Sequence, residues 1–336
     1  MNKFNLKKIA IIYSILFAVI TWLVCSWIYG EGNLIGNATV IINKGNGSGV
    51  VASKLKDAGV INKAWLFKLV ARFMKLDKKL KAGEYIFDTK ISMYDVLTKL
   101  ANGDVIYRKI TLPEGLTSAQ MLKIIDDEKF LTGEITVDVK DGEMMPDTYS
   151  FMYGDTKDSL ILQTKKSMSL ALENAWKKRN LKLPIRDMNE LLTLASIIEK
   201  ETAIDSERGL VASVFVNRLQ KGMRLQTDPT VIYALTMGKK DLGRSLKKKD
   251  LKIDSPYNTY KYYGLPPSPI CNPGRLSLEA AANPEKSPYL YFVADGKGGH
   301  NFSKSLQEHN DNIQNWLKER KAKKRMKAKR KKIVEK

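Results

Sequence analysis

The sequence has few of the residues on which metal, thiol and imidazole chemistry depends. Its 336 residues include two cysteines and two histidines. It contains no H-E-x-x-H segment, no Cys/His cluster spaced for zinc, no G-x-S-x-G turn and no phosphate-binding loop with a Lys-Ser/Thr pair. These absences argue against zinc hydrolases, serine hydrolases and nucleotide-binding enzymes. We therefore expect a site without a metal and without a cofactor.

The two cysteines are too few for a framework of disulfides. Cys25 lies within an apolar N-terminal run, and Cys271 lies in the distant C-terminal half. We do not expect these two residues to pair. Cysteine usage therefore leaves the redox compartment open.

Acidic side chains are scarce relative to basic ones. Lys and Arg number 57 and Asp and Glu number 36, which gives a formal net charge of +21. Residues 317–336 alone hold twelve Lys or Arg and two Glu. A basic chain favours an anionic partner, such as nucleic acid, anionic lipid or an acidic wall polymer. For the C-terminal tail, the alternative interpretation is a solvated helix.

A long apolar run is present near the N-terminus. No charged residue occurs from Ile9 to Tyr29, and about 20 apolar residues match the thickness of a bilayer. Trp22 and Trp27 lie toward its far end, where aromatic rings favour the membrane interface. Lysines precede the run, whereas the first lysine after it is Lys44. The positive-inside rule predicts a single-pass anchor at 9–29, with residues 1–8 in the cytoplasm and the bulk outside.

A cleaved signal peptide is the alternative interpretation of this run. We find no small-x-small cleavage site at its end, and its apolar core is long for a signal peptide, so an uncleaved anchor is favoured. An extracytoplasmic protein has little access to DNA, RNA or ATP. No nucleic acid partner is therefore expected, and a membrane-tethered nucleic-acid binder is a hypothesis that rests on charge alone.

A strand–turn–helix pattern recurs after the apolar run. Short strands are predicted at Thr39–Ile42, Gly83–Phe87 and Lys109–Leu112, followed by helices at Val50–Ala58, Met93–Leu100 and Ser118–Asp126. This pattern predicts a small α+β domain and is compatible with a weak internal duplication.

Helical periodicity dominates the second half of the chain. It predicts helices at Ser159–Lys178 and Asp187–Thr202, and Asp187 with Glu190 matches the pattern of a capping box. Residues 255–303 are rich in Pro, Gly, Asn and Tyr, which predicts long structured loops. Binding and catalytic groups are often held on such loops.

Two glutamates follow an apolar stretch in the segment LLTLASIIEKETA, residues 191–203. With successive residues about 100° apart on a helix, Glu201 falls inside the apolar arc and Glu199 falls near its other edge. A carboxyl on an apolar face is costly to ionise, so its pKa should rise, and a raised pKa suits a general acid near neutral pH. The alternative is that both glutamates reach solvent or pair with Lys200 or Arg208. Spacing alone does not choose between them.

Aromatic residues gather in the predicted loops. The tyrosines concerned are Tyr257, Tyr260, Tyr262, Tyr263, Tyr289 and Tyr291. Core packing is the default interpretation of such a cluster, and a sugar-stacking groove is the functional alternative.

A series of motifs in order resembles one family. They are KAGEY at 81–85, PDTY at 146–149, LASIIEKETA at 194–203, RLQTDPTVIYAL at 224–235, YNTY at 257–260, GLPP at 264–267, NPG at 272–274, YLYFVADGKGGH at 289–300 and EHN at 308–310. The chain resembles the endolytic murein transglycosylase family, also called MltG or YceG-like. The resemblance covers most of the chain, and so many ordered motifs are far more specific than any one of them.

The resemblance implies an α+β fold in several parts. These are a small lysin-motif-like α+β domain (30–140) and a mainly helical catalytic domain with long loops (141–316), after the cytoplasmic tail (1–8) and transmembrane helix (9–29) expected from the apolar run. The basic tail (317–336) is longer and more charged than the family requires. The resemblance also implies a location in the bacterial cytoplasmic (inner) membrane. Peptidoglycan glycan strands are the implied substrate, and wall synthases are candidate partners.

The resemblance further implies a reaction without water, carried out by one glutamate. The β-1,4 bond between N-acetylmuramic acid and N-acetylglucosamine is broken when the muramyl 6-hydroxyl attacks its own C1, which leaves a 1,6-anhydro end. The family's catalytic glutamate corresponds to Glu201, acting as acid and then as base. The implied role is to terminate elongation of nascent strands. A non-enzymatic membrane-anchored scaffold that binds peptidoglycan is the alternative.

The same resemblance names residues that would line the glycan groove. They are Gln226, Thr227, Asp228, Tyr257, Asn258, Thr259 and Tyr260. The chain departs from the family pattern at Ser268, where Gly is usual, and in the segment DGEMM, which lacks an aromatic residue. Neither departure touches Glu201.

Overall fold

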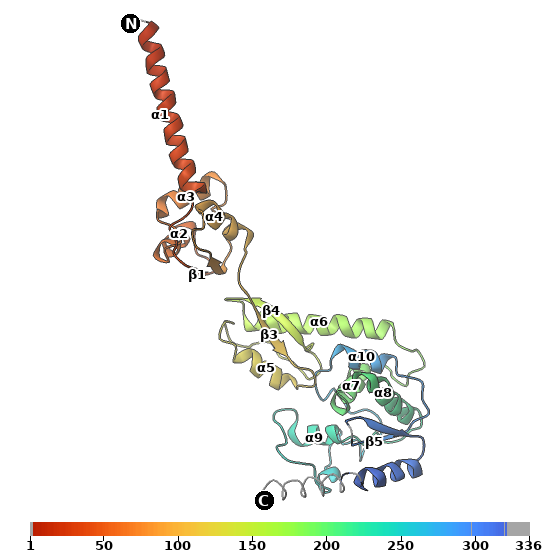
Figure 1. Cartoon of the computed structure of the whole chain (residues 1–336). Coiled ribbons are helices and arrows are strands. Elements are labelled where there is room, and N and C mark those ends of the chain that lie inside the picture. The colour runs from red at the N-terminus through yellow and green to blue at the C-terminus, as the bar shows by residue number, and fades with distance from the viewer. Residues whose placement is uncertain (1–2, 297, 319, 321–336) are drawn as a thin grey trace, which may run out of the picture. The chain divides into compact units, whose positions relative to one another are not determined.

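The structure is a computed structural model that describes residues 3–296, 298–318 and 320. It mixes helices and short strands, as expected (Figure 1). The chain divides into two compact units. Unit 1 comprises residues 1–109, 129–132 and 150–156, and unit 2 comprises 110–128, 133–149 and 157–336. Each unit is described by itself.

Helix α1 (Lys3–Tyr29) begins unit 1. Within it, Lys8–Tyr29 is long and apolar enough to cross a membrane, and none of this stretch is buried within the protein. The helix at 9–29 was therefore predicted correctly, and its composition is that of a candidate single-pass anchor.

The rest of unit 1 packs helices against a two-stranded antiparallel sheet. Strand β1 (Ala38–Ile42) pairs with β2 (Gly83–Phe87), with Val40 opposite Tyr85. Between the two strands lie α2 (Ser48–Asp57) and α3 (Ala64–Phe73), and α4 (Met93–Asn102) follows β2. Alternate strand residues point into a core that the helices complete, because a strand shows opposite faces at successive residues. The predicted strands and the helices α2 and α4 are confirmed to within a few residues.

Helix α3 was not predicted from the sequence. Its sequence, AWLFKLVARF, is apolar except for Lys68 and Arg72, which lie one turn apart on one side, so the helical period was present but overlooked. Leu66, Phe67, Val70 and Ala71 form its buried face. Other large apolar side chains on α3 are exposed.

Strands β3 (Tyr107–Leu112) and β4 (Asp147–Met152) form a second two-stranded sheet. The division between the units falls within both strands. Helix α5 (Ser118–Asp126) follows β3, as expected, and begins with a complete capping box between Thr117 and Gln120.

Unit 2 is built around the buried helix α7 (Met188–Glu201). Around it pack α6 (Lys157–Lys177), α8 (Asp205–Gln220), α9 (Asp228–Thr236) and α10 (Arg275–Ala282). In Figure 1, α7, α8 and α10 lie together in the green and blue part of the chain. The core consists of Leu, Ile, Val and Ala from α7 and α8 with smaller residues of α10. Burial on several sides explains the almost continuous apolar run of α7.

The start of α7 confirms half of the predicted capping box. The Asp187 side chain accepts a hydrogen bond from the Glu190 amide at 2.8 Å. The Glu190 carboxylate accepts from the amide of Arg186, at 2.7 Å, rather than from that of Asp187. Both bonds satisfy amides at the helix start that have no partner within the helix.

Residues 255–303 contain more regular structure than predicted. Helix α10 lies within them, and β5 (Tyr291–Ala294) forms an antiparallel hairpin with β6 (His300–Ser303). The many Pro and Gly residues concealed these short elements. Residues 306–318 are helical. Most of the predicted basic tail, 319 and 321–336, lies outside the described residues.

Candidate functional site

Glu201 lies at the end of α7 and lines a cavity of about 490 Å³ within unit 2. The cavity is also lined by residues of α8, of segment 225–228, of strand β5 and of the helical segment 306–318. Phe215, Leu225 and Phe292 make part of its wall apolar. A concave, partly apolar space with a few polar groups is the usual form of a small-ligand site.

The carboxyl of Glu201 is placed so that its protonated form is favoured. Burial raises its pKa, and the charge of Asp228 adds to the rise. The Thr227 hydroxyl donates a hydrogen bond to Oε1 and opposes the rise, as do His300 and Arg218. The net direction is upward. Glu201 therefore combines a raised pKa with access to a cavity, which is the combination expected of a general acid.

Glu199, its rival on the same turn, has a different environment. Its side chain is 6% exposed, and Oε2 accepts hydrogen bonds from the Gly274 amide at 2.9 Å and the Ser277 hydroxyl at 2.8 Å. Its Oε1 lies 3.8 Å from the guanidinium of Arg208. Gly274 is the N-cap residue of α10, so Glu199 holds the start of that helix. It is not among the residues that line the Glu201 cavity.

Segment 226–228 brings three of the predicted groove residues to the cavity. Gln226 adopts a positive φ of 54°, which is uncommon outside glycine. This turn lets the chain pass from residue 225 into α9 while the Thr227 hydroxyl meets Glu201. Backbone conformations of this kind often occur at functional sites, where surrounding contacts hold them in place.

Asp228 and Tyr260 form a pair at the cavity wall. The Tyr260 hydroxyl donates to Oδ1 of Asp228 at 2.7 Å. Burial raises the pKa of Tyr260, and the hydrogen bond to Asp228 raises it further, so the phenol stays protonated. Pro229 follows Asp228 at the start of α9, a position that proline favours.

The other three predicted groove residues do not line this cavity. The amide of Asn258 is fully buried and donates to the carbonyls of Leu251 and Ile253. The Thr259 hydroxyl accepts from the Thr227 amide at 3.1 Å. Asn258 and Thr259 thus hold the segments from which Tyr260 and Thr227 reach the site.

Tyr257 has contacts on both its ring and its hydroxyl. Its ring packs on Tyr233 with centroids 4.8 Å apart. Its hydroxyl lies 2.6 Å from that of Ser268, so the serine found where glycine was expected gains a partner. The predicted binding role of Tyr257 stays a prediction.

Sequence reasoning missed two cationic or titratable residues of the cavity, Arg218 and His309. Arg218 is 8% exposed and donates to the carbonyls of Leu290 and Leu225 at 2.6 and 2.7 Å. In the sequence, Arg218 was marked only as a single charged residue after the apolar run of α8. The His309 ring stacks on Tyr291 with centroids 5.1 Å apart, and burial lowers its pKa. In the sequence it appeared only as part of the EHN motif, without a role.

The aromatic cluster divides between the two interpretations given for it. Tyr260 and Tyr291 line the cavity. Tyr289 packs on Phe302, and Tyr262 donates its hydroxyl to Asp254. The guanidinium of Arg224 lies 4.5 Å from the ring centre of Tyr263.

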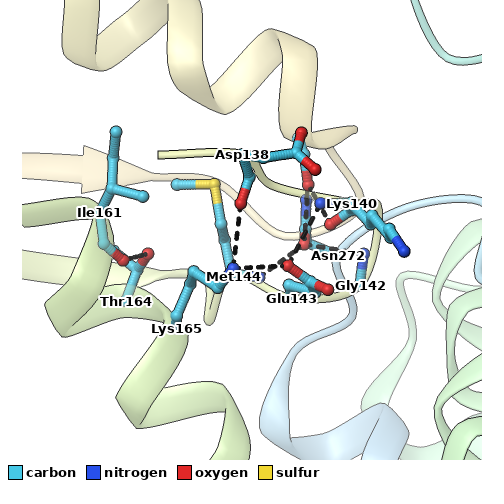
Figure 2. A network of polar contacts seen from close by, with 10 residues as sticks. Asp138, Lys140, Gly142, Glu143, Met144, Ile161, Thr164, Lys165 and Asn272 are labelled. Atoms are coloured by element: carbon cyan, nitrogen blue, oxygen red, sulfur yellow. Dashed lines mark hydrogen bonds and ion pairs between the residues drawn. The ribbon is translucent and has the colours of Figure 1, made fainter. Parts of the chain in front are cut away.

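Asn272, in the NPG motif, forms hydrogen bonds with residues 116, 142 and 144 of unit 2. Figure 2 shows its side chain between Lys140, Gly142 and Met144. Its Oδ1 accepts from the amides of Gly142 and Met144 at 3.0 and 2.9 Å, and its Nδ2 donates to the carbonyl of Leu116 at 3.1 Å. Next to it, the Ile270 amide donates to the Ser196 hydroxyl of α7 at 3.0 Å. The segment that includes the motif therefore contacts the helix that carries Glu201 through the amides of Ile270 and Gly274.

Among the described residues, no three His, Cys, Asp or Glu side chains are grouped so that they could hold a metal ion. Cys25 and Cys271 are both free. The Cys271 thiol is fully buried and contacts the carbonyl of Ser196 at 3.3 Å.

The chain is similar to known proteins in sequence. Residues 40–315 match the model of the YceG-like family. An endolytic murein transglycosylase of Bacillus subtilis (strain 168) is 36% identical over 305 residues, which cover 81% of this chain and 83% of that protein. An endolytic murein transglycosylase of Streptococcus pneumoniae (serotype 2, strain D39) is 32% identical over 321 residues, covering 81% of this chain and 57% of that protein.

A solved structure agrees with these matches. The crystal structure of a yceG-like protein from Listeria monocytogenes is 34% identical, with a TM-score of 0.51, and the match covers 82% of this chain and 98% of that one. The family match extends over most of the chain and includes every cavity residue named above. The chain belongs to the YceG-like family.

Proposed function

We propose that this protein is a lytic transglycosylase that cuts peptidoglycan glycan strands, with Glu201 as its acid and then its base. The observation that carries the proposal is a carboxyl with a raised pKa that opens onto a partly apolar cavity. Relatives named endolytic murein transglycosylase support the substrate and the reaction class.

The proposed reaction needs one proton carrier. Protonated Glu201 donates its proton to the glycosidic oxygen, and the bond from that oxygen to C1 of N-acetylmuramic acid breaks. The 6-hydroxyl of the same sugar bonds to C1 and gives its proton to the Glu201 carboxylate. The proton count closes without water, and holding the ring with its 6-hydroxyl near C1 supplies the proximity.

The lining residues have proposed roles in this scheme. Thr227 orients the Glu201 carboxyl through Oε1. Gln226, Asp228 and Tyr260 present polar groups to the sugar, while Tyr291 offers an aromatic face. Tyr257, Asn258 and Thr259 remain proposed members of a longer groove.

A hydrolase is the second candidate, because Asp228 lines the same cavity as Glu201. Ordinary glycosidases use two carboxyl groups, the second of which attacks the sugar or activates water. The hydrogen bond from Tyr260 occupies one oxygen of Asp228. This bond favours the scheme in which Glu201 is the only carboxyl group that takes part in the reaction.

Mass spectrometry of the products from purified glycan strands separates these candidates. A transglycosylase leaves 1,6-anhydro ends, and a hydrolase leaves reducing ends that are heavier by one water. Reducing ends would overturn the proposal in favour of hydrolysis. Strand binding without any cleavage would favour the scaffold.

The location and domain plan are also proposed. We propose that α1 anchors the protein in the cytoplasmic membrane, with its N-terminus inside and the site outside, where nascent strands are released from synthases. We keep the proposal of a lysin-motif-like domain at 30–140 and a catalytic domain at 141–316. The order β1, α2, α3, β2 with antiparallel strands supports a compact small domain near the anchor.

A further inference from the structure

Helix α3 in unit 1 exposes a stripe of large apolar side chains. Trp65 is 57% exposed, Leu69 is 58% exposed and Phe73 is 87% exposed. These residues are spaced four apart, so they follow one another along a single face of the helix. The opposite face, with Phe67 and Ala71, is buried in the core of unit 1. The helix is therefore apolar on two faces, and only one of them has a partner within the described residues.

Basic residues border this stripe. Lys68 and Arg72 are exposed on α3, with Lys63 just before the helix and Lys75 just after it. No Asp or Glu occurs between residues 58 and 76. Exposed apolar side chains beside cations, without anions, form the kind of helix that lies in the interface of an anionic membrane.

The start of α3 contacts the end of the candidate membrane span. The Lys63 ammonium lies 3.4 Å from the centre of a ring of Trp27. Ser26, Trp27, Lys63 and Leu66 together line a cavity of about 330 Å³ in unit 1. Trp27 is near the end of the span Lys8–Tyr29, where aromatic rings favour the membrane interface. A helix that begins against Trp27 begins at the level of the lipid headgroups.

We propose that α3 is a second membrane contact, with Trp65, Leu69 and Phe73 inserted into the interface of an anionic bilayer. Lys68 and Arg72 would then lie among the lipid phosphates. The proposal rests on α1 being a membrane anchor and is independent of the reaction at Glu201. Two contacts would hold unit 1 against the membrane surface, whereas α1 alone would leave it free to tilt.

Spin labels in the full-length protein test this placement. In a Cys25→Ser background, where Cys271 is buried, single labels are introduced by Leu69→Cys on the stripe, Ser53→Cys on the exposed side of α2 and Val19→Cys in α1. The protein is reconstituted in nanodiscs of phosphatidylglycerol mixed with phosphatidylcholine. Collisions with oxygen report lipid, and collisions with a water-soluble nickel chelate report solvent.

We expect the labels at positions 69 and 19 to favour oxygen and the label at 53 to favour the chelate. If the label at 69 resembles that at 53 while that at 19 reports lipid, the proposal fails and the anchor stands. If the label at 19 reports water, the anchor fails and the proposal fails with it. Low access of both reagents to the label at 69 would indicate a protein partner and would also overturn the proposal.

Charge variants then test the lipid type. The double variant Lys68→Gln, Arg72→Gln should lower the equilibrium constant for docking of α3 on the anionic membrane on the order of fivefold for each cation removed. Lys56→Gln on α2 is the matched control, since it removes an exposed cation away from the stripe. Equal docking in pure phosphatidylcholine would overturn the assignment of an anionic surface. Unchanged thermal melting of each variant shows that the fold is intact.

Discussion

The last turn of α7 carries two glutamates, Glu199 and Glu201, on different faces and in different surroundings. Glu199 faces α10 and the Arg208 guanidinium and accepts two hydrogen bonds. Glu201 faces a cavity, and burial raises its pKa. Glu199 is held by two hydrogen-bond donors and lies near a cation, whereas the surroundings of Glu201 favour its protonated form. The partners around a carboxyl, rather than its place on a helix, therefore decide whether it holds the fold or is available for chemistry.

Replacing Glu201 should have the largest effect of any change at this turn. Glu201→Gln keeps the shape but removes the transferable proton, so we expect strand cleavage to fall by at least about a hundredfold. Release of anhydro products from purified strands measures it. Glu199→Gln is the matched control and should remain within a few-fold of the wild type. Equal losses in both variants would remove the distinction between the two faces.

Truncating Glu199 should instead cost stability. Glu199→Ala leaves the Gly274 amide and the Ser277 hydroxyl without their acceptor, whereas Arg208 keeps its ion pair with Asp205. Leaving two buried donors without an acceptor is expected to lower the free energy of unfolding by about 3 kcal/mol. Urea unfolding measures the change. A loss below about 1 kcal/mol, within the range of a single neutral hydrogen bond, would contradict the proposed bracing role.

The pH dependence of stability should reveal the raised pKa of Glu201. A carboxyl whose pKa is raised by folding stabilises the protein below its ordinary pKa, and this contribution is lost as pH rises through the raised value. The Glu201→Gln variant cannot ionise at this position and does not lose this stability. Its free energy of unfolding should therefore exceed that of the wild type by an amount that grows as pH rises above the ordinary pKa range of glutamate. The gain is at most about 1.4 kcal/mol for each unit by which the pKa is raised. A pH-independent difference would show that the Glu201 pKa is not elevated.

The smallest predicted effect concerns Thr227. Its hydroxyl donates to Glu201 and holds the carboxyl pKa lower than burial alone would. Thr227→Val should therefore move the alkaline limb of the kcat/KM profile to higher pH, with a loss of a few-fold at the optimum. Thr227→Ser retains the hydroxyl and should leave the limb in place. A limb that moves to lower pH in Thr227→Val would contradict this role.

Much of the local structure could be predicted from the sequence. The bounds of β2 and α5 and the cap at Asp187 follow from alternation, periodicity and capping chemistry. Helix α3 was missed although its two cations lie on one side and its apolar residues on the others, so its period was present in the sequence. The hairpin β5–β6 was missed because its strands are short and lie among turn residues.

The candidate site was harder to predict, because its members meet only in three dimensions. The helical wheel placed Glu199 and Glu201 near one apolar arc but contained no information on Gly274 or Ser277, more than 70 residues away. Arg218 and His309 reach the cavity from α8 and from segment 306–318. The resemblance to a family selected Glu201, and the environment of Glu199 supplies a physical reason for that selection.

The brace at Asn272 has a consequence for the order in which the chain can fold. Its side chain joins residues 116, 142 and 144, and these contacts close loops of more than 120 residues. Such distant contacts form slowly, since their loops must close before any bond is gained. Until residues 270–277 have been synthesised, residues 116, 142 and 144 lack this brace, and α7 lacks the groups that bind Glu199. A chain truncated before that segment therefore retains Glu201 but lacks the contacts that hold its helix.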